Sequence, residues 1–319
     1  MSVIGSSPCL GSLAMSTRWA YERIIPSRIA VKLSPWSPKH SFRRRRGSLN
    51  QFPKATYPGQ KTPLPTWAPD WRSQLAPSYC DDQYYFSASK SSMIFVETSN
   101  DRVLGLKGLV VCTIVKVGEE WIDDGDASRR LNHLSTIHDF CKESAALGHD
   151  LYDVSTLQRE GAVWRVPIGD LCPRRGEPTT SERTHFCGHS MAQLYARYVQ
   201  LTRYLANPEA EQGTTVELQH AKERSCTAYM LAMARMHDMR PFLTEVGYIG
   251  MGPGLMEVGD AVVIFAGADI PHVLRRTSDK HWEYVGEAYC DGVMDGEFWN
   301  ERVTWPDGGG QELETFLLV

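Results

Sequence analysis

The chain has 319 residues, of which 42% are hydrophobic and 23% are charged, a composition typical of a globular protein with a sizeable core. Its formal net charge is −4, and nine of the 34 Lys and Arg residues but only one acidic residue lie in Met1–Arg46. The remaining sequence is therefore acidic, which argues against nucleic acid as a partner because phosphate contacts need clustered Lys and Arg. No apolar run approaches the ~18 residues of a membrane span, so no membrane partner is expected.

The eight cysteines are scattered along the chain and form no CxxC pair. Scattered cysteines in a chain of this size are typical of reduced, intracellular thiols. No basic start leads into an apolar segment, as it does in a secretory signal peptide. These observations predict a cytoplasmic protein.

Residues 1–62 are rich in Ser, Pro and Arg and poor in acidic residues. Such a segment has too little apolar surface to fold, so the sequence predicts a disordered basic tail, followed by a single domain at residues 63–319. Two alternatives stay open. The first is a mitochondrial transit peptide, which shares this composition. The second is a nuclear-import patch at Arg43–Arg46.

Two tryptophans, Trp67 and Trp71, flank Pro69 in the segment Leu64–Arg72. We expect both indoles to pack as apolar anchors on the domain, because large aromatic side chains bury much surface. A peptide-recognition site is the alternative interpretation.

The run Val103–Val117 is too rich in β-branched residues for a helix and long enough for a bent or bulged strand. We expect it to pair with strands near the C-terminus. Residues about 128–240 would then form a helical insertion.

Apolar residues in that middle part recur at helical spacing. The pattern predicts helices at Ser128–Leu147, Ser190–Leu205 and Val216–His237. The third helix has a methionine-rich face, which we expect to be core rather than a partner surface. Pro173–Gly176 is expected to be a surface loop.

Three possible zinc ligands, His185, Cys187 and His189, lie within five residues. A structural zinc site needs four ligands, usually from two separated pairs, and no second pair stands out in the sequence. A helix start near Met191, capped by Ser190 or His189, is the preferred interpretation.

The part from Gly247 to Glu297 has four short apolar runs separated by turn residues, which predicts an antiparallel meander or barrel. The runs are Tyr248–Met251, Ala261–Ala266, His272–Leu274 and Glu283–Tyr289. The fold class expected from these patterns is α+β: a small antiparallel β-barrel built from about 103–117 and 247–297, with a helical layer inserted.

Two patterns in this part resemble ligand-binding motifs, but neither has the residues or elements that its ligand requires. The glycines 250, 252 and 254 are followed by a turn and a strand rather than by the helix that a phosphate cradle needs. We expect them to form a turn. The segment Asp291–Glu297 resembles the start of a calcium loop. Such a loop would need ligands at its third and twelfth positions, which are Val293 and Arg302 here. We expect Asp295 to bind local backbone in a turn instead.

Several segments resemble fungal heterokaryon-incompatibility (HET domain) proteins, in the family's order. They read LPTWAPDWR, VLGLKGLVVCTIVKVG, GYIGMGP, GD before an apolar strand, PHVLR and YVGEAYCDGVMDGE. The matching motif residues, for which we expect structural roles, are Trp67, Trp71, Gly247, Tyr248, Gly250, Gly252, Pro253, Gly259, Asp260, Pro271, Arg275, Gly286, Glu287, Gly292, Asp295 and Gly296.

The resemblance covers roughly Leu64 to Glu297, and nothing in Met1–Thr62 resembles the family's HET domain. It implies a non-catalytic C-terminal module that regulates a HET domain or contacts a protein partner in nonself recognition. No catalytic residue, metal ligand or cofactor is assigned. The partner is unidentified, with a HET domain and an incompatibility partner as candidates. The competing hypothesis is a zinc-dependent or Cys/His hydrolase built around His185–His189 and the cysteines.

Overall fold

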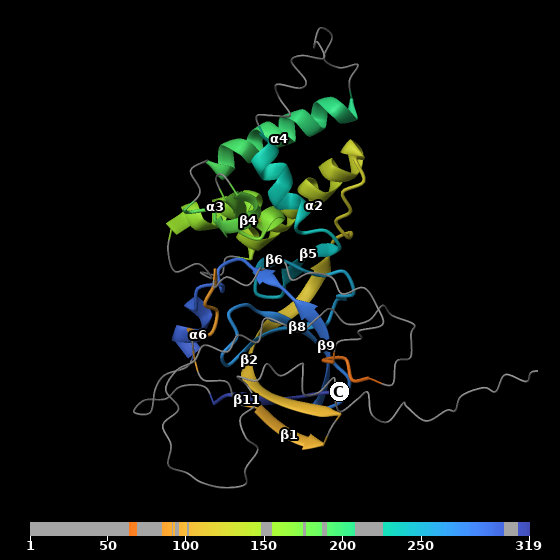
Figure 1. Ribbon diagram of the computed structural model, residues 1–319, viewed down its shortest axis with the longest axis vertical. Coiled ribbons are helices and arrows are strands. Elements are labelled where there is room, and N and C mark those ends of the chain that lie inside the picture. Colours follow the sequence, from red (N-terminus) through yellow and green to blue (C-terminus); the bar gives the residue numbers. More distant parts are fainter. Residues whose placement is uncertain are drawn as a thin grey trace, which may run out of the picture. The chain divides into compact units, whose positions relative to one another are not determined.

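The computed structural model describes residues 64–68, 85–90, 92, 96–100, 102–147, 155–174, 177–186, 190–207, 226–302 and 312–319 (Figure 1). The chain divides into the units Met1–Gly47 and Ser48–Val319, and all described residues belong to the second. The expected tail, residues 1–62, and Trp71 lie outside the described residues.

A nine-stranded sheet runs in the order β10-β6-β5-β2-β11-β9-β8-β7, and β1 pairs with β2 off this path. Its strands are β1 (Val96–Asn100), β2 (Val103–Val117), β5 (Met239–Thr244), β6 (Ile249–Pro253), β7 (Ala261–Phe265), β8 (His272–Arg276), β9 (His281–Glu287), β10 (Tyr289–Cys290) and β11 (Glu314–Leu318). Because β7 also pairs with β2, the strands β2, β11, β9, β8 and β7 form a partially closed ring, called the ring below (Figure 1).

Strand β2 belongs both to the ring and to the part of the sheet made by β5, β6 and β10. Its first part pairs with β11 and β7, and Ile114–Val117 pair with β5. Its register shifts between Val110 and Cys112 and again between Ile114 and Lys116. The prediction of one long, bulged strand is confirmed, and these irregularities bend β2 between the two parts of the sheet.

The prediction of a purely antiparallel barrel from 103–117 and 247–297 is wrong in one respect. Strand β11 lies beyond that range and pairs in parallel with β9, with Leu317 opposite His281. Its five residues, ETFLL, carry too short a pattern to be recognised from sequence. Antiparallel pairing to β2 fixes its place instead.

The interior of the ring is filled by aromatic side chains. The ring centroid of Phe265 lies 5.2 Å from that of His272 and 5.8 Å from that of Phe316. Strands β7 and β11 are not neighbours, since β2 lies between them, so their side chains meet inside the ring. The ring centroid of Tyr284 lies 5.7 Å from that of His272. All four residues are at most 1% exposed.

A helical layer follows β2 in the chain and precedes β5. It contains α2 (Ala127–Ala146), α3 (Ser155–Arg165), α4 (Met191–Ala206) and the helical residues 226–234. Asp126 caps α2 by accepting hydrogen bonds from the backbone N–H groups of Ser128 and Arg129. The predicted helices are confirmed within the described residues; residues 216–225 of the third lie outside them, and its helical part ends at residue 234.

The layer also contains a small hairpin, which the sequence did not indicate. Its strands are β3 (Leu171–Arg174) and β4 (Glu177–Arg183), and it follows the single turn η1 (Val166–Ile168). Of the expected loop Pro173–Gly176, Pro173 and Arg174 lie in β3 instead, and residues 175 and 176 lie outside the described residues.

Two further cores lie outside the ring interior. One joins the helices to β5, β6 and β10, and includes Met233 and Met236 at 1% exposure, which are core as predicted. Met230, on the same methionine-rich face, is only partly buried and packs against this core. The other joins the outward side chains of the ring to β5, β10 and α6 (Glu297–Arg302). Val285 of β9 belongs to it and is 5% exposed, so the outward face of this strand is covered at this position.

Candidate functional site

Two arginines of the helical layer hold two aspartates of the loop that follows β10. We call this cluster of Arg165, Arg183, Asp170, Asp291 and Asp295 the arginine–aspartate junction. It ties the helical layer to the loop between β10 and α6, so it is the point where two parts of the fold are fixed to each other.

The first half of the junction is a bidentate pair. Arg165 Nε and Nη2 donate to the two carboxylate oxygens of Asp291 at 3.0 and 2.9 Å. The Tyr289 hydroxyl donates to the same carboxylate at 2.6 Å. Burial, followed by the charge of Asp291, raises the pKa of Tyr289 well above its ordinary value, so the phenol is neutral and acts as a donor.

In the second half, one guanidinium binds two carboxylates. Arg183 Nη1 and Nη2 donate to the two oxygens of Asp295 at 2.8 and 2.9 Å, and Nε donates to Asp170 at 2.8 Å. Nη1 also donates to the backbone oxygen of Tyr85 at 3.0 Å, and the guanidinium lies 4.4 Å from the centre of the Phe86 ring. Almost every donor of this buried cation is therefore matched.

The local backbone explains why Asp170 can take this place. Gly169 and Asp170 both have left-handed φ values, +56° and +54°, directly after η1. This turn directs Asp170 toward β4, where Thr184 donates its hydroxyl hydrogen to the carboxylate. Aspartate tolerates this conformation better than most residues, which fits its role here.

The charges in the junction are strongly coupled. Burial alone lowers the pKa of the Arg165 and Arg183 guanidinium groups, but hydrogen bonds and charges of the aspartates outweigh it and raise both pKa values. Burial raises the pKa of Asp170, and the charge of Arg183 partly offsets that rise. Buried charges of this kind are tolerated only when they are paired and hydrogen-bonded.

The expectation that Asp295 binds local backbone is wrong, because its carboxylate binds Arg183 from 112 positions away. The local backbone N–H of Asp295 is bound by Glu297 Oε2 instead, at 2.8 Å. Gly292 and Gly296 have φ values of +91° and +81°, so the predicted turns are present on either side.

A second motif pair is Asp260 with Arg275. Arg275 Nε and Nη2 donate to the Asp260 carboxylate at 2.9 and 3.0 Å, and Nη2 also donates to the backbone oxygen of Leu255. Asp260 accepts from the backbone N–H of Glu257 at 2.8 Å as well. Together with Gly259 at φ +98°, these bonds form the tight turn expected before β7.

The expected glycine turn is wrong for Gly250 and Gly252, which lie inside strand β6, whereas Gly254 lies in the turn that follows this strand. A Cβ on Gly250 would lie 2.1 Å from the backbone oxygen of Tyr289, and one on Gly252 would lie 2.6 Å from the Met256 sulfur. The glycines permit close approach of neighbouring chain rather than a turn.

The other motif residues are spread over the fold. Trp67 is 7% exposed, and its indole N–H faces the backbone oxygen of Arg102 at 3.4 Å. Gly247 and Tyr248 precede β6, Pro253 ends it, Pro271 precedes β8, and Gly286 and Glu287 end β9. The motif residues therefore form two ion-pair clusters and several close contacts, and the structure does not gather them at one site.

The proposed zinc cluster cannot be assembled from the described residues, since Cys187 and His189 lie outside them. Within the described ranges, no group of three His, Cys, Asp or Glu residues is placed to hold a metal ion. Burial raises the pKa of Cys112 and of Cys141 to about 12. Burial also lowers the pKa of His133 to about 4 and that of His272 to about 3.

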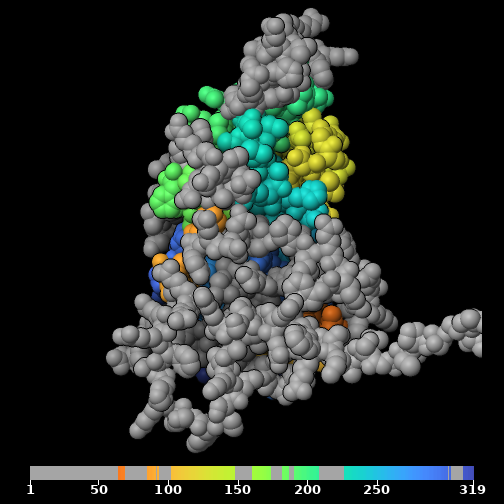
Figure 2. Space-filling view, viewed as in Figure 1, coloured from red at the N-terminus to blue at the C-terminus, as the bar shows by residue number. Residues whose placement is uncertain are grey.

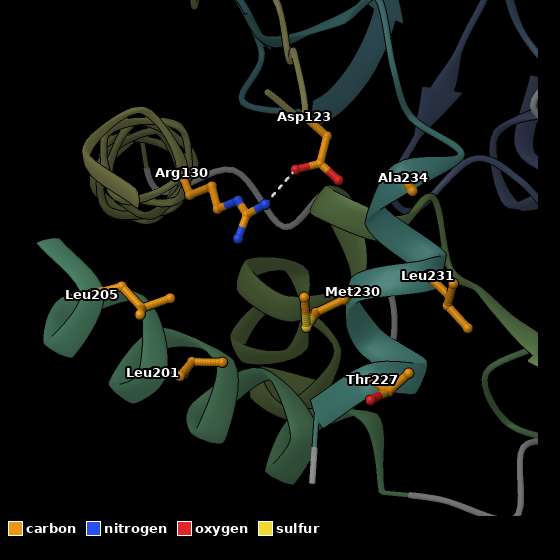
Figure 3. A pocket seen from close by; sticks show the side chains of 8 residues that line it. All are labelled: Asp123, Arg130, Leu201, Leu205, Thr227, Met230, Leu231 and Ala234. Atoms are coloured by element: carbon orange, nitrogen blue, oxygen red, sulfur yellow. Dashed lines mark hydrogen bonds and ion pairs between the residues drawn. The ribbon is translucent and has the colours of Figure 1, made fainter. Parts of the chain in front are cut away.

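A pocket of about 270 Å³ lies in the helical layer, between α2, α4 and residues 226–234 (Figure 3). Apolar side chains form most of its wall, and Arg130 extends into it beside Asp123, to which its Nη2 donates at 2.6 Å. The lining residues are Asp123, Arg130, Leu201, Leu205, Thr227, Met230, Leu231 and Ala234.

Sequence reasoning missed most of the junction. No role was predicted for Arg165, Arg183, Asp170 or Tyr289. One signal was present: two Asp-Gly pairs four residues apart, at Asp291 and Asp295, in a segment that failed as a calcium loop. Arginine binds a carboxylate through two parallel hydrogen bonds, so it is an alternative partner for aspartates that bind no metal.

Among the described helices, none combines the length and apolarity needed to cross a membrane.

Residues 101–304 match the family model described as the Het-6 beta-barrel domain. Heterokaryon incompatibility protein 6, OR allele, of Neurospora crassa is 33% identical over 277 residues, which cover 79% of this chain and 40% of that protein. No solved structure matches the chain.

The chain therefore belongs to the heterokaryon-incompatibility family that carries the Het-6 beta-barrel domain. The resemblance seen in the sequence motifs is confirmed. The chain spans 40% of the length of the curated relative it matches, so the activity of that whole protein does not transfer to it directly.

Proposed function

We propose that this chain is a non-catalytic interaction module of the heterokaryon-incompatibility system, which contacts a protein partner in the cytoplasm during nonself recognition. The observation that carries the proposal is the arginine–aspartate junction. Its buried carboxylates, those of Asp170 and Asp291, are occupied by guanidinium groups of the same chain, so they serve to fix the helical layer rather than to bind a substrate.

The ionisation of the buried thiols and imidazoles also supports a non-catalytic role. A nucleophilic cysteine needs a lowered pKa, whereas burial raises the pKa of Cys112 and Cys141 to about 12. A general base works best with a pKa near neutrality, whereas burial lowers the pKa of His272 to about 3. These groups favour packing over catalysis, so the hydrolase hypothesis gains no support from them.

The partner proposed is the portion of a heterokaryon-incompatibility protein that lies outside the stretch matched here. The test mixes this chain with that portion of the Neurospora protein and measures the molar mass of the eluted species by light scattering. We expect a stoichiometric complex. Separate elution of the two proteins at concentrations of tens of micromolar would overturn the proposal.

Metal analysis of the purified chain addresses the enzyme alternative. We expect less than stoichiometric zinc. Zinc at one equivalent that is lost in His189→Ala, but kept in the exposed-residue control His138→Ala, would favour the zinc enzyme.

A further inference from the structure

We propose that residues 64–68, called the strap below, form a releasable clip that keeps the ring closed where β9 meets β11. We call this junction the seam. Release of the strap opens the seam while the other strand pairs of the ring stay formed. Figure 1 shows the strap, in orange, beside β9 and close to the C-terminal end of the chain. Part of it is visible in orange at the surface in Figure 2.

The seam is the weakest junction of the ring. Strands β9 and β11 pair in parallel, and parallel pairing is slightly less stable per residue than antiparallel pairing. In the part of the chain that the structure describes, the seam has two residue pairs, Leu317 with His281 and Leu318 with Trp282. The junctions β11–β2, β2–β7 and β8–β9 have five pairs each, and β7–β8 has three. Opening the seam therefore leaves an unbroken sheet in the order β11-β2-β7-β8-β9.

Thr66 of the strap binds both sides of the seam. Its backbone N–H donates to the backbone oxygen of Val319, directly after β11, at 2.9 Å, and its hydroxyl donates to the same oxygen. The hydroxyl oxygen also accepts from the backbone N–H of Tyr284 in β9, at 2.9 Å. One threonine side chain therefore bridges the two strands that pair most weakly.

Trp67 anchors the strap at a third place. Its side chain is buried, and its indole N–H faces the backbone oxygen of Arg102, between β1 and β2, at 3.4 Å. The strap itself forms a turn, because the backbone N–H of Ala68 donates to the backbone oxygen of Pro65 at 3.0 Å. Because Thr66 and Trp67 are adjacent in this turn, burial of the indole holds the threonine on the seam. The strap is therefore bound and released as one unit.

Opening of the seam separates aromatic side chains that meet across it. The ring centroids of Trp282 in β9 and Phe316 in β11 lie 5.5 Å apart, and Phe316 is buried. Exposing this surface costs free energy, so the open ring is a minor state whose population the strap controls. Residue 64 continues into the preceding part of the chain, so an event there that draws the strap away raises that population. The inference concerns a movement within the chain and does not depend on the partner proposed above.

The test measures hydrogen exchange of the Val319 amide by NMR in the full chain. This N–H donates across the seam to the backbone oxygen of Trp282 at 3.0 Å, so it reports opening without itself being bound by the strap. Thr66→Val removes both hydroxyl hydrogen bonds. It should speed exchange at Val319 about five- to a hundredfold, the effect of two hydrogen bonds. Thr66→Ser keeps the hydroxyl and should exchange at close to the wild-type rate.

Two further variants separate release of the strap from other effects. Trp67→Ala should also speed exchange at Val319, although Thr66 is intact, because it frees the strap as a unit. Thr315→Val makes the same substitution as Thr66→Val at an exposed position of β11 and should leave the exchange rate unchanged. Amides of β5 and β6, which lie outside the ring, should exchange at the wild-type rate in every variant.

Three outcomes overturn the inference. The first is a wild-type exchange rate at Val319 in Thr66→Val. The second is a wild-type rate in Trp67→Ala, which would mean that the strap is not released as a unit. The third is an equal acceleration in β5 and β6, which would mean that these residues stabilise the whole domain rather than the seam.

Discussion

Arg183 and Asp295 form a two-bond ion pair at 2.8 and 2.9 Å although 112 positions separate them in the chain. The same guanidinium binds Asp170 in the turn after η1. One side chain therefore connects the hairpin β3–β4 to the loop after β10. Bidentate pairs fix orientation as well as distance, so the helical layer has a defined position on the β10 loop.

Replacing Arg183 by Met should lower the free energy of unfolding by about 3–5 kcal/mol, because it leaves the buried Asp170 carboxylate without its cation. The Asp170 side chain is 6% exposed, so water cannot replace the lost partner. Urea denaturation followed by tryptophan fluorescence measures the change.

An exposed ion pair of the same protein provides the control for this prediction. Lys142 and Asp139 are 64% and 58% exposed, and such pairs contribute about 0–1 kcal/mol. Lys142→Met should therefore be close to neutral. A loss of less than about 1 kcal/mol in Arg183→Met would contradict the structural role of the junction.

Gly250→Ala should destabilise the protein more than Gly252→Ala, although both lie in β6. A Cβ at position 250 would meet the backbone oxygen of Tyr289 at 2.1 Å, which cannot move without shifting a strand. At position 252 it would meet the flexible end of Met256. Overpacking costs about 1–3 kcal/mol, and we expect Gly250→Ala at or above the top of that range. Equal melting temperatures for the two variants would show that close approach is not the reason for the glycine.

Phe265→Ala should cost about 3–5 kcal/mol, because it leaves a cavity inside the ring next to His272 and Phe316. Val258→Ala, at a position that is 64% exposed, serves as the control and should change stability by less than about 0.5 kcal/mol. Chemical denaturation of both variants measures this. A near-neutral Phe265→Ala would mean that the ring interior is not a packed core.

Stability should fall in acid partly through His133. Its pKa is lowered from 6.5 to about 4 by burial, so below pH 6.5 the unfolded chain binds a proton that the folded chain does not. Stability from this group is complete above pH 6.5 and is lost as the pH falls toward 4. We expect a loss of about 2–3 kcal/mol between pH 7.5 and 4.5 from this residue.

The substitution His133→Phe keeps a ring against Trp121, whose centroid lies 4.8 Å away, and removes the titrating group. The variant should lose less stability than wild type between these pH values. His138→Phe, at an exposed position of the same helix, is the control and should follow the wild-type curve. Parallel curves for wild type and His133→Phe would contradict the assignment.

Much of the fold could be predicted because its signals are local. The β-branched run at Val103–Val117 and the helical spacing of α2 and α4 depend on residues close in sequence. Strand β11 was missed because pairing with the distant strands β2 and β9 stabilises it, and propensity does not record that. The hairpin β3–β4 pairs only with itself, but its Arg183 is held by the distant Asp295 and Tyr85. Gly250 was misread as a turn residue because glycine serves both turns and close contacts.

The candidate site was harder to predict for the same physical reason. Asp260 was expected in a turn, and its backbone bond to Glu257 is local, but its pair with Arg275 crosses from the start of β7 to β8. Asp295 has its decisive partner in Arg183, and no sequence spacing indicates which arginine reaches a given aspartate. Such partners follow from the assembled fold alone.

The interaction role is tested most directly by calorimetric titration of this chain with the portion of the Neurospora relative outside the matched stretch. The account predicts saturable one-to-one binding that is unchanged in Cys141→Ala, because a thiol without a catalytic role is dispensable for it. Absence of binding by the folded chain would contradict the account, as would hydrolysis of the partner during the titration that is lost in Cys141→Ala.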